Sequence, residues 1–220
     1  MALRLQRQGT AMLECGCSAI HQRQRIVLTG GPGAGKTAVL ELARSMLCRH
    51  LRVLPESASI LFGGGFPRVP FQQGREAAQI AIFAVQRQVE AVEDARDPPA
   101  VALCDRGTVD ALAYWPGAPE EFWKRVRSSR EYELARYAAV IHMRPPEGGQ
   151  GWDNRNPLRP ESAAQAAELD RRIALAWEGH PRRRFIESSP DFLAKARRAI
   201  DALCLELPPC CRPAFAAPHT

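Results

Sequence analysis

The sequence predicts an α/β fold in which a mainly parallel, five-stranded sheet carries helices on both faces. Three observations support this prediction. Short apolar runs alternate with segments of helical periodicity along most of the 220 residues. A glycine-rich turn joins the first apolar run to the first helical segment. Several of the runs end in a charged residue, and the chain length suits one domain of this kind.

The expected strands are short runs rich in Val, Ile and Leu, at residues 25–29, 51–54, 101–104, 139–143 and 184–187. Helical spacing is found between them, at about 35–48, 74–96, 107–114, 119–136, 161–178 and 190–204. The longest of these helices is expected to pack through one apolar face, made of Ala78, Ile82, Val85, Val89 and Val92. The glycine-rich stretch 62–67 is expected to be a loop.

Residues 30–37 read GGPGAGKT and match the complete phosphate-binding pattern G-x-x-x-x-G-K-[ST]. The glycines let the backbone curl so that N–H groups point at a polyphosphate, and the following helix adds its positive end. Lys36 is expected to reach the β- and γ-phosphates, and the Thr37 hydroxyl to ligate Mg²⁺. The strand before the loop and the helix after it argue against a chance match. The residues expected to bind the nucleotide are Gly31, Gly33, Ala34, Gly35, Lys36, Thr37 and Ala38.

This loop predicts a P-loop NTPase that binds ATP with Mg²⁺. No Asn-Lys-x-Asp motif for reading guanine occurs in the sequence, which disfavours a GTPase. In open α/β sheets, ligands bind at the carboxyl ends of the strands. The charged residues at those ends are therefore the candidates for catalysis.

Asp105 closes the third expected strand and is expected to organise Mg²⁺ opposite Thr37. The same carboxylate could cap the following turn. Arg106 is expected to contact a phosphate or the acceptor, with a surface ion pair as the alternative. Glu56 follows the second strand, where it could accept the proton of an acceptor hydroxyl as a general base. The alternative for Glu56 is a solvated carboxylate.

The segment 144–160 lacks periodicity, is rich in Gly, Asn and Pro, and contains Arg144, Arg155 and Arg159. It is expected to be a lid that excludes water and brings an arginine to the developing charge, of which Arg144 and Arg155 are the catalytic candidates. An ordinary surface loop is the alternative. Four aromatic residues either line an acceptor pocket or belong to the core: Phe62, Phe66, Tyr114 and Trp115.

The net charge of +6 comes from basic residues that are nearly all Arg and are dispersed along the chain, so a nucleic-acid partner is not expected. No apolar run approaches the roughly 20 residues of a membrane span, and no secretory signal is visible, so a cytoplasmic protein is expected. The domain is expected at 24–205, between a flexible N-terminal extension at 1–23 and a disordered tail at 206–220.

The chain has seven cysteines, an odd number. Cys15-x-Cys17 and the Cys210-Cys211 pair could be a metal site or a terminal disulfide, but neither has C-x-x-C spacing with a second pair. Incidental free thiols in a reducing cytoplasm are the simplest explanation.

Five segments carry a family resemblance: GGPGAGKT (30–37), LPES (54–57), FPR (66–68), DRGTVDALAYWPG (105–117) and HPRRRFIESSPDF (180–192). On these residues the chain resembles small P-loop ATPase/kinase domains related to the nicotinamide-riboside kinase domain, which are similar to nucleoside and thymidylate kinases. The resemblance implies a kinase-type sheet, ATP with Mg²⁺ and a lid with arginines. The family's Asp-Arg pair matches Asp105 and Arg106, and its strand-two acid matches Glu56. The resemblance leaves the acceptor open.

The sequence therefore predicts an ATP-dependent kinase that transfers the γ-phosphate to a hydroxyl of a small metabolite, for instance a nucleoside-like one. The alternative is a nucleotide-dependent regulatory ATPase that binds a protein partner. A large ring-forming motor is disfavoured, because little sequence remains after the fifth strand for a helical lid domain. The oligomeric state is left open.

Overall fold

The computed structural model describes residues 21–48, 50–96, 100–146 and 162–212. Five strands form one parallel sheet in the order β2-β3-β1-β4-β5. Their bounds are β1 Gln24–Thr29, β2 Leu51–Leu54, β3 Val101–Asp105, β4 Ala139–Met143 and β5 Arg183–Ile186. Each strand lies within one residue of its predicted position. The predicted fold class is confirmed.

The helices are α1 Lys36–Met46, α2 Ser57–Gly63, α3 Gln72–Asp94, α4 Asp110–Tyr114, α5 Pro119–Val126, α6 Arg130–Ala135, α7 Ala163–Ala176 and α8 Phe192–Glu206, followed by the 3₁₀ helix η2 Pro209–Cys211. The single helix expected at 119–136 is two helices. Arg127 ends α5 in the left-handed conformation, and the Ser129 hydroxyl caps α6 by accepting from the Tyr132 N–H. Helix α2 lies partly where a loop was expected, since its apolar residues precede the glycines.

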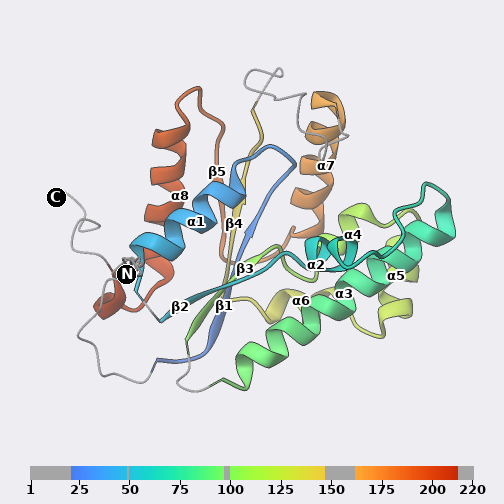
Figure 1. Ribbon diagram of the computed structural model, residues 1–220, viewed down its shortest axis with the longest axis horizontal. Helices are drawn as coiled ribbons and strands as arrows, with labels where there is room; N and C mark the ends of the chain where they lie inside the picture. The colour runs from blue at the N-terminus through green and yellow to red at the C-terminus, as the bar shows by residue number, and fades with distance from the viewer. Residues whose placement is uncertain (1–20, 49, 97–99, 147–161, 213–220) are drawn as a thin grey trace, which may run out of the picture.

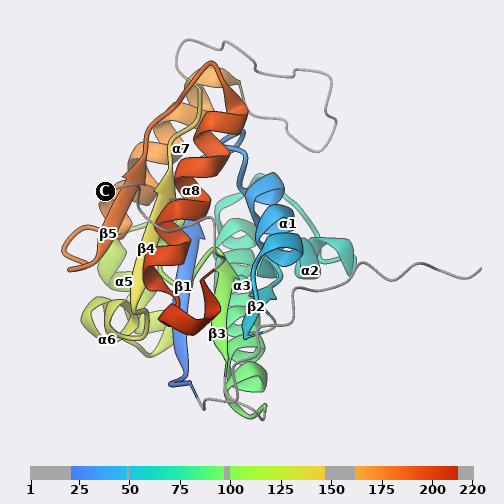
Figure 2. The ribbon, with the colours of Figure 1, turned by 90° about the vertical axis from the view of Figure 1, so that its left-hand side faces the viewer.

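The sheet lies between two layers of helices (Figure 1). Helices α1 and α8 cover one face, where Ile26, Leu28 and Ile141 meet buried side chains such as Leu40 and Leu203. They lie side by side in front of the sheet in the rotated view (Figure 2). Helices α3 to α7 lie on the other side. Because both faces are covered, the strands read as continuous apolar runs.

Helix α3 packs through a more polar face than the sequence predicted. The expectation was wrong for Val92, which is 59% exposed, whereas Gln86, Glu90 and Glu93 are buried. The physical reason is that basic residues from other elements neutralise the carboxylates of Glu90 and Glu93. Arg52, for example, donates to the Glu93 carboxylate at 2.7 Å. Buried charges are tolerated when they are paired and hydrogen-bonded.

Glu90 lies at the centre of this polar layer. Its carboxylate is fully buried, accepts from the Tyr137 hydroxyl and the Gln86 amide at 2.8 Å each, and pairs with the Arg136 guanidinium. Arg25 from β1 lies 3.5 Å away. These contacts tie α3 to β1 and to the two residues that follow α6, Arg136 and Tyr137.

The C-terminal segment is more ordered than predicted. Disorder was expected from residue 206, but α8 includes Glu206, and Leu207 and Cys211 are each 3% exposed. His21, in the expected N-terminal extension, is also buried. Residues 1–20 and 213–220 lie outside the described part of the chain. Within the described residues, no helix combines the length and apolar character that crossing a membrane requires.

Replacing Glu90 by Ala is expected to lower the free energy of unfolding by about 3–5 kcal/mol. Arg136, Arg25 and Tyr137 would each lose a buried carboxylate partner, and only Arg136 would keep a second one, Glu133. Urea unfolding followed by circular dichroism measures this change. The control is Glu41→Ala, which removes an exposed i,i+3 ion pair to Arg44 and should cost less than about 1 kcal/mol. Equal losses in both variants would contradict the assignment of Glu90 as a buried anchor.

Candidate functional site

The loop between β1 and α1 curls because its glycines adopt backbone angles that other residues avoid. Gly30, Gly33 and Gly35 have φ values of 129°, 76° and 89°. A Cβ on Gly30 would lie 2.0 Å from the carbonyl oxygen of Met143, at the end of the neighbouring strand β4. Gly35 is the N-cap of α1. The loop therefore opens toward the start of this helix, whose N-terminal N–H groups suit a phosphate.

Lys36 is held over this loop. Its Nζ donates to the carbonyl oxygens of Gly30 and Gly31 at 2.8 and 2.9 Å. Burial lowers the pKa of Lys36 to about 7, and the charge of Arg106 adds to the effect against the opposing influence of Asp105. Thr37 is exposed in the first turn of α1. Both functional side chains of the motif thus lie at the mouth of the loop.

Asp170 on α7 supports the loop from behind. Its Oδ1 accepts from the Gly31 N–H at 2.8 Å and lies 2.7 Å from Nε2 of His142. Its Oδ2 accepts from Arg144 at 2.7 Å. These contacts hold the pKa of Asp170 below its usual value although burial opposes them. Sequence reasoning missed Asp170, because nothing local distinguishes it from other acids on an amphipathic helix.

Lys195 on α8 supports the same loop from another side. Its buried Nζ donates to the Ala34 carbonyl at 2.9 Å and to the Arg144 carbonyl. Sequence reasoning missed this residue as well. A signal existed, because Lys195 is one of only three lysines in a chain with 30 basic residues. An ammonium group forms a compact point of contact that a planar guanidinium does not replace.

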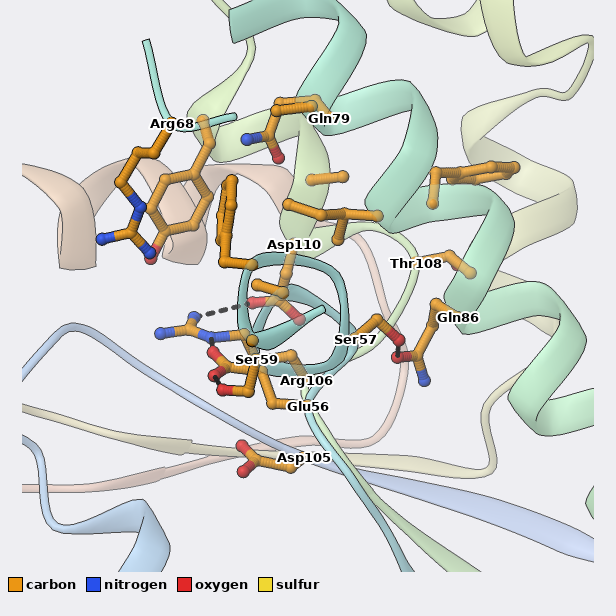
Figure 3. Close-up of a pocket in the computed structure, with 18 of the residues that line it drawn as sticks. Glu56, Ser57, Ser59, Arg68, Gln79, Gln86, Asp105, Arg106, Thr108 and Asp110 are labelled. Atoms are coloured by element: carbon orange, nitrogen blue, oxygen red, sulfur yellow. Dashed lines mark hydrogen bonds and ion pairs between the residues drawn. The ribbon is translucent and has the colours of Figure 1, made fainter. Parts of the chain in front are cut away.

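Glu56 and Arg106 form an ion pair across the carboxyl ends of β2 and β3 (Figure 3). Arg106 Nε donates to Glu56 Oε1 at 2.8 Å, and the Ser59 hydroxyl donates to Oε2. Burial would raise the pKa of Glu56, but Arg106 and Ser59 outweigh it and lower the pKa. Glu56 is therefore ionised at neutral pH.

Arg106 has a φ of 69°, a left-handed conformation that costs a residue with a side chain on the order of 1 kcal/mol. Its guanidinium lies 3.7 Å from Asp110 Oδ1, opposite Glu56. Asp110 is itself oriented by the Gly107 N–H at 2.8 Å, the Trp177 indole at 3.2 Å and the Thr29 hydroxyl. Strain of this kind collects at functional sites, where surrounding contacts hold it.

Asp105 closes β3 beside this pair, and its carboxylate points away from the cluster around Asp110 (Figure 3). Burial and the negative charge of Glu56 together raise the pKa of Asp105 to about 6. A divalent cation would relieve this repulsion, because Mg²⁺ prefers oxygen ligands and favours ionised carboxylates. Thr37 and Asp105 are a donor set that fits Mg²⁺.

A cavity of about 890 Å³ connects these residues. At one end it is lined by Gly33, Lys36, Thr37, Glu56, Asp105 and Arg106. It continues between α2, α3 and α4, where its lining includes Phe62, Arg68, Gln79, Ile82, Gln86 and Tyr114. The structure brings six of the predicted site residues into one cavity. The cavity as a whole is in the size range of small-molecule sites, and its part between α2, α3 and α4 is called the second compartment below.

The aromatic residues divide between this cavity and the core. Phe62 and Tyr114 line the cavity, as an acceptor pocket requires. Trp115 is 2% exposed and packs in a core cluster with Phe83 and Phe122. Phe66 makes an edge contact with Phe62 but does not belong to the lining.

The floor of the second compartment is polar and pre-oriented. The Ser57 hydroxyl donates to Gln86 Oε1 at 2.6 Å, and the same amide donates to Glu90 at 2.8 Å (Figure 3). Thr108, also in the lining, donates through its hydroxyl to Glu133 at 2.8 Å. The buried layer described above therefore fixes the groups that a ligand would meet.

The predicted lid is only partly described. Arg144 is half-exposed, pairs with Asp170 behind the loop, and does not belong to the cavity lining. Arg155 and Arg159 lie outside the described residues. Their catalytic role stays a prediction.

The parallel sheet has the order 2-3-1-4-5, a complete phosphate-binding loop follows β1, and an acid-arginine pair lies in the same cavity. Together these features define a P-loop NTPase fold. A family model described as an AAA domain matches residues 25–195. The chain belongs to this AAA domain family. A search of curated proteins found no match.

Two solved structures share the fold. A crystal structure of NadR protein in complex with NR aligns with a TM-score of 0.58 at 16% identity, over 83% of this chain and 51% of that chain. Thymidylate kinase from Candida albicans aligns with a TM-score of 0.53 at 10% identity, over 84% of this chain and 92% of the kinase. The chain thus spans about half of the NadR chain. The predicted resemblance to small P-loop kinases is confirmed at the level of the fold.

The raised pKa of Asp105 makes stability depend on pH in a definite direction. The folded protein holds this proton up to about pH 6, against an ordinary pKa of 3.8. The resulting stabilisation is complete below the ordinary pKa and is lost as the pH rises through the folded value. Asp105→Asn should therefore gain about 1–3 kcal/mol relative to the parent between about pH 4 and pH 7.5.

Urea unfolding at both pH values, without Mg²⁺ or nucleotide, measures this gain. The control is Asp201→Asn, an exposed residue of α8, which should change stability by less than about 0.5 kcal/mol at either pH. A pH-independent difference between Asp105→Asn and the parent would contradict the proton assignment.

Proposed function

We propose that this protein is an ATP-dependent kinase that transfers the γ-phosphoryl group to a hydroxyl of a small, nucleoside-like acceptor, with Mg²⁺. The observation that carries the proposal is the single cavity in which Glu56 and Arg106 lie between the phosphate-binding loop and a second compartment. Hydrolysis of ATP requires only the loop, a metal and a water molecule. A second compartment beside an ionised carboxylate is what transfer to an acceptor requires.

The chemistry of the second compartment favours a flat, polar ring. The Arg68 guanidinium lies over the Phe62 ring at 4.3 Å from its centroid, which builds a flat wall. Gln79 presents an amide, and Ile82 adds an apolar surface. A nucleobase or similar ring offers both a stacking face and an edge that forms hydrogen bonds with amides. The structural likeness to thymidylate kinase supports this acceptor class.

The reaction follows from the placement of Glu56. The acceptor oxygen forms a bond to the γ-phosphorus while the bond to the bridging oxygen breaks, and ADP leaves. The proton of the acceptor hydroxyl passes to Glu56, which its lowered pKa keeps ionised at neutral pH. Phosphoryl transfer has a loose transition state, so this proton step contributes less than charge neutralisation and positioning.

The cationic side chains supply that neutralisation. Lys36 would leave the carbonyls of Gly30 and Gly31 for the β- and γ-phosphates, and the charged ammonium would be favoured by their negative charge. Arg106 lies on the acceptor side, fixed by Glu56 and Asp110. Mg²⁺, when bound, offsets further charge on the phosphates, and Thr37 and Asp105 are the residues that would hold it.

We also propose that 144–160 is a lid that starts from a fixed point, because Asp170 and Lys195 hold Arg144 by its side chain and its carbonyl. Arg155 is proposed to act from within the lid. Buried free thiols at Cys104 and Cys204 fit the reducing cytoplasm expected for this protein. The proposal includes neither a nucleic-acid partner nor a membrane.

The release of ADP from ATP and Mg²⁺, measured with a panel of nucleosides, nucleotides, sugars and vitamin-like alcohols, tests this function. One acceptor class should raise turnover at least about tenfold over slow hydrolysis, because an acceptor that fills the second compartment replaces water at the γ-phosphate. Lys36→Ala is the control for contaminating kinases and should abolish the stimulated rate. A flat panel would contradict the kinase and favour a regulatory ATPase, tested next by nucleotide-dependent capture of a protein partner.

Glu56→Gln should bind ATP as tightly as the parent but transfer the phosphoryl group about 10²–10⁴-fold more slowly, if Glu56 is the general base. Single-turnover kinetics with the stimulating acceptor separates this step from binding. Glu41→Gln, an exposed position on α1, is the matched control and should leave both quantities unchanged. An unchanged transfer rate in Glu56→Gln would show that Glu56 is not the general base and only positions Arg106.

A further inference from the structure

Three buried Cys and His side chains gather far from the cavity, and a fourth lies beside one of them. They are His21, Cys48, His50 and Cys211, each less than 9% exposed. Cys211 Sγ lies 3.2 Å from His21 Nε2 and 3.3 Å from His50 Nδ1. Cys48 Sγ lies 3.2 Å from the same His50 nitrogen. The ligand atoms of His21, His50 and Cys211 all lie within 4.8 Å of one another.

These residues come from three separate parts of the chain. His21 precedes β1, Cys48 and His50 connect α1 to β2, and Cys211 lies in the 3₁₀ helix after α8. His50 directly precedes β2, so the cluster lies at the amino edge of the parallel sheet. The phosphate-binding loop follows β1 and lies at the opposite, carboxyl edge. The cluster is therefore not part of the kinase site.

Two thiols and two imidazoles are the ligand set of a closed, tetrahedral zinc site. With Zn–S of about 2.3 Å and Zn–N of about 2.0–2.1 Å, tetrahedral geometry places sulfur and nitrogen about 3.6 Å apart. The observed separations of 3.2, 3.3 and 3.2 Å are within a few tenths of an ångström of this value. A small outward shift of these pairs would admit the ion, and the Cys48 side chain would turn from His50 toward His21 and Cys211 to complete the site.

We propose that His21, Cys48, His50 and Cys211 form a structural Cys₂His₂ site for Zn²⁺. Binding releases the two thiol protons and leaves zinc with two thiolates and two neutral imidazoles, a site without net charge. Such a donor set selects Zn²⁺ over Mg²⁺, which prefers oxygen ligands. All four positions are filled by protein, so the ion would have no open site for catalysis.

The site would fasten both ends of the domain to the sheet. The His50 carbonyl accepts from the Val101 N–H at 2.7 Å, which anchors the cluster to β3. Through the metal, His21 and Cys211 would be joined to this anchor although 190 residues separate them in sequence. This cross-link would hold the buried Cys211 in place, in a Pro- and Cys-rich tail that was expected to be disordered.

The test uses the full chain, purified without chelator, with metal content measured by mass spectrometry. The expected result is one zinc ion per chain. Cys211→Ser and His21→Ala should each lower the affinity for added Zn²⁺ at least about tenfold, because each removes a ligand. Cys204→Ser is the matched control, a buried free cysteine of α8 outside the cluster, and should retain the metal.

A second measurement on the parent chain does not depend on how the variants fold. Replacement of zinc by Co²⁺ should give the visible absorption bands of a tetrahedral site and a thiolate charge-transfer band, and a chelator should lower Tm. Absence of these bands, together with Zn²⁺ binding no tighter than in Cys211→Ser, would overturn the proposal. A disulfide between Cys48 and Cys211 in the non-reduced mass would overturn it too. ATP turnover is not part of this test, so its outcome is independent of the proposed function.

Discussion

The approach of Gly30 to the Met143 carbonyl is the constraint on which the site depends. Strands β1 and β4 pair in parallel, and the chain leaves β1 so close to the end of β4 that a methyl group would lie 2.0 Å from a carbonyl oxygen. The loop must therefore curl at once, which brings the start of α1 to the carboxyl edge of the sheet. Lys36, Thr37 and the helix N-terminus take their places from this one turn.

The charges around that turn are stable only because the fold balances them. Lys36 and Asp105 have pKa values shifted toward neutrality by burial, whereas Glu56 is kept ionised by Arg106. Asp170 and Lys195 hold the loop from behind with hydrogen bonds to backbone groups. A site that holds partly unpaired charges costs stability in the unliganded protein, and a triphosphate with its metal would remove that cost. This is the usual balance between stability and function.

Much of this could be predicted because the relevant signals are local. A few consecutive residues are enough to recognise the loop motif, each of the five strands and each charged strand end. The parallel sheet then places Glu56, Asp105 and Arg106 at one edge. The polar face of α3 could not be predicted. Glu90 and Glu93 look like solvent-facing residues until the partners Arg136 and Arg52 are known, and these come from other elements.

The sequence by itself determined the fold class, the phosphate-binding loop and the charged strand ends, because periodicity and motif spacing act within one segment of the chain. Only the tertiary structure decided which distant groups support them. Asp170 and Lys195 reach the loop from helices more than 130 residues further along the chain. His21, His50 and Cys211 meet only because the two ends of the domain return to the same edge of the sheet. Side-chain contacts across such separations depend on how the helices pack, and no local pattern records that packing.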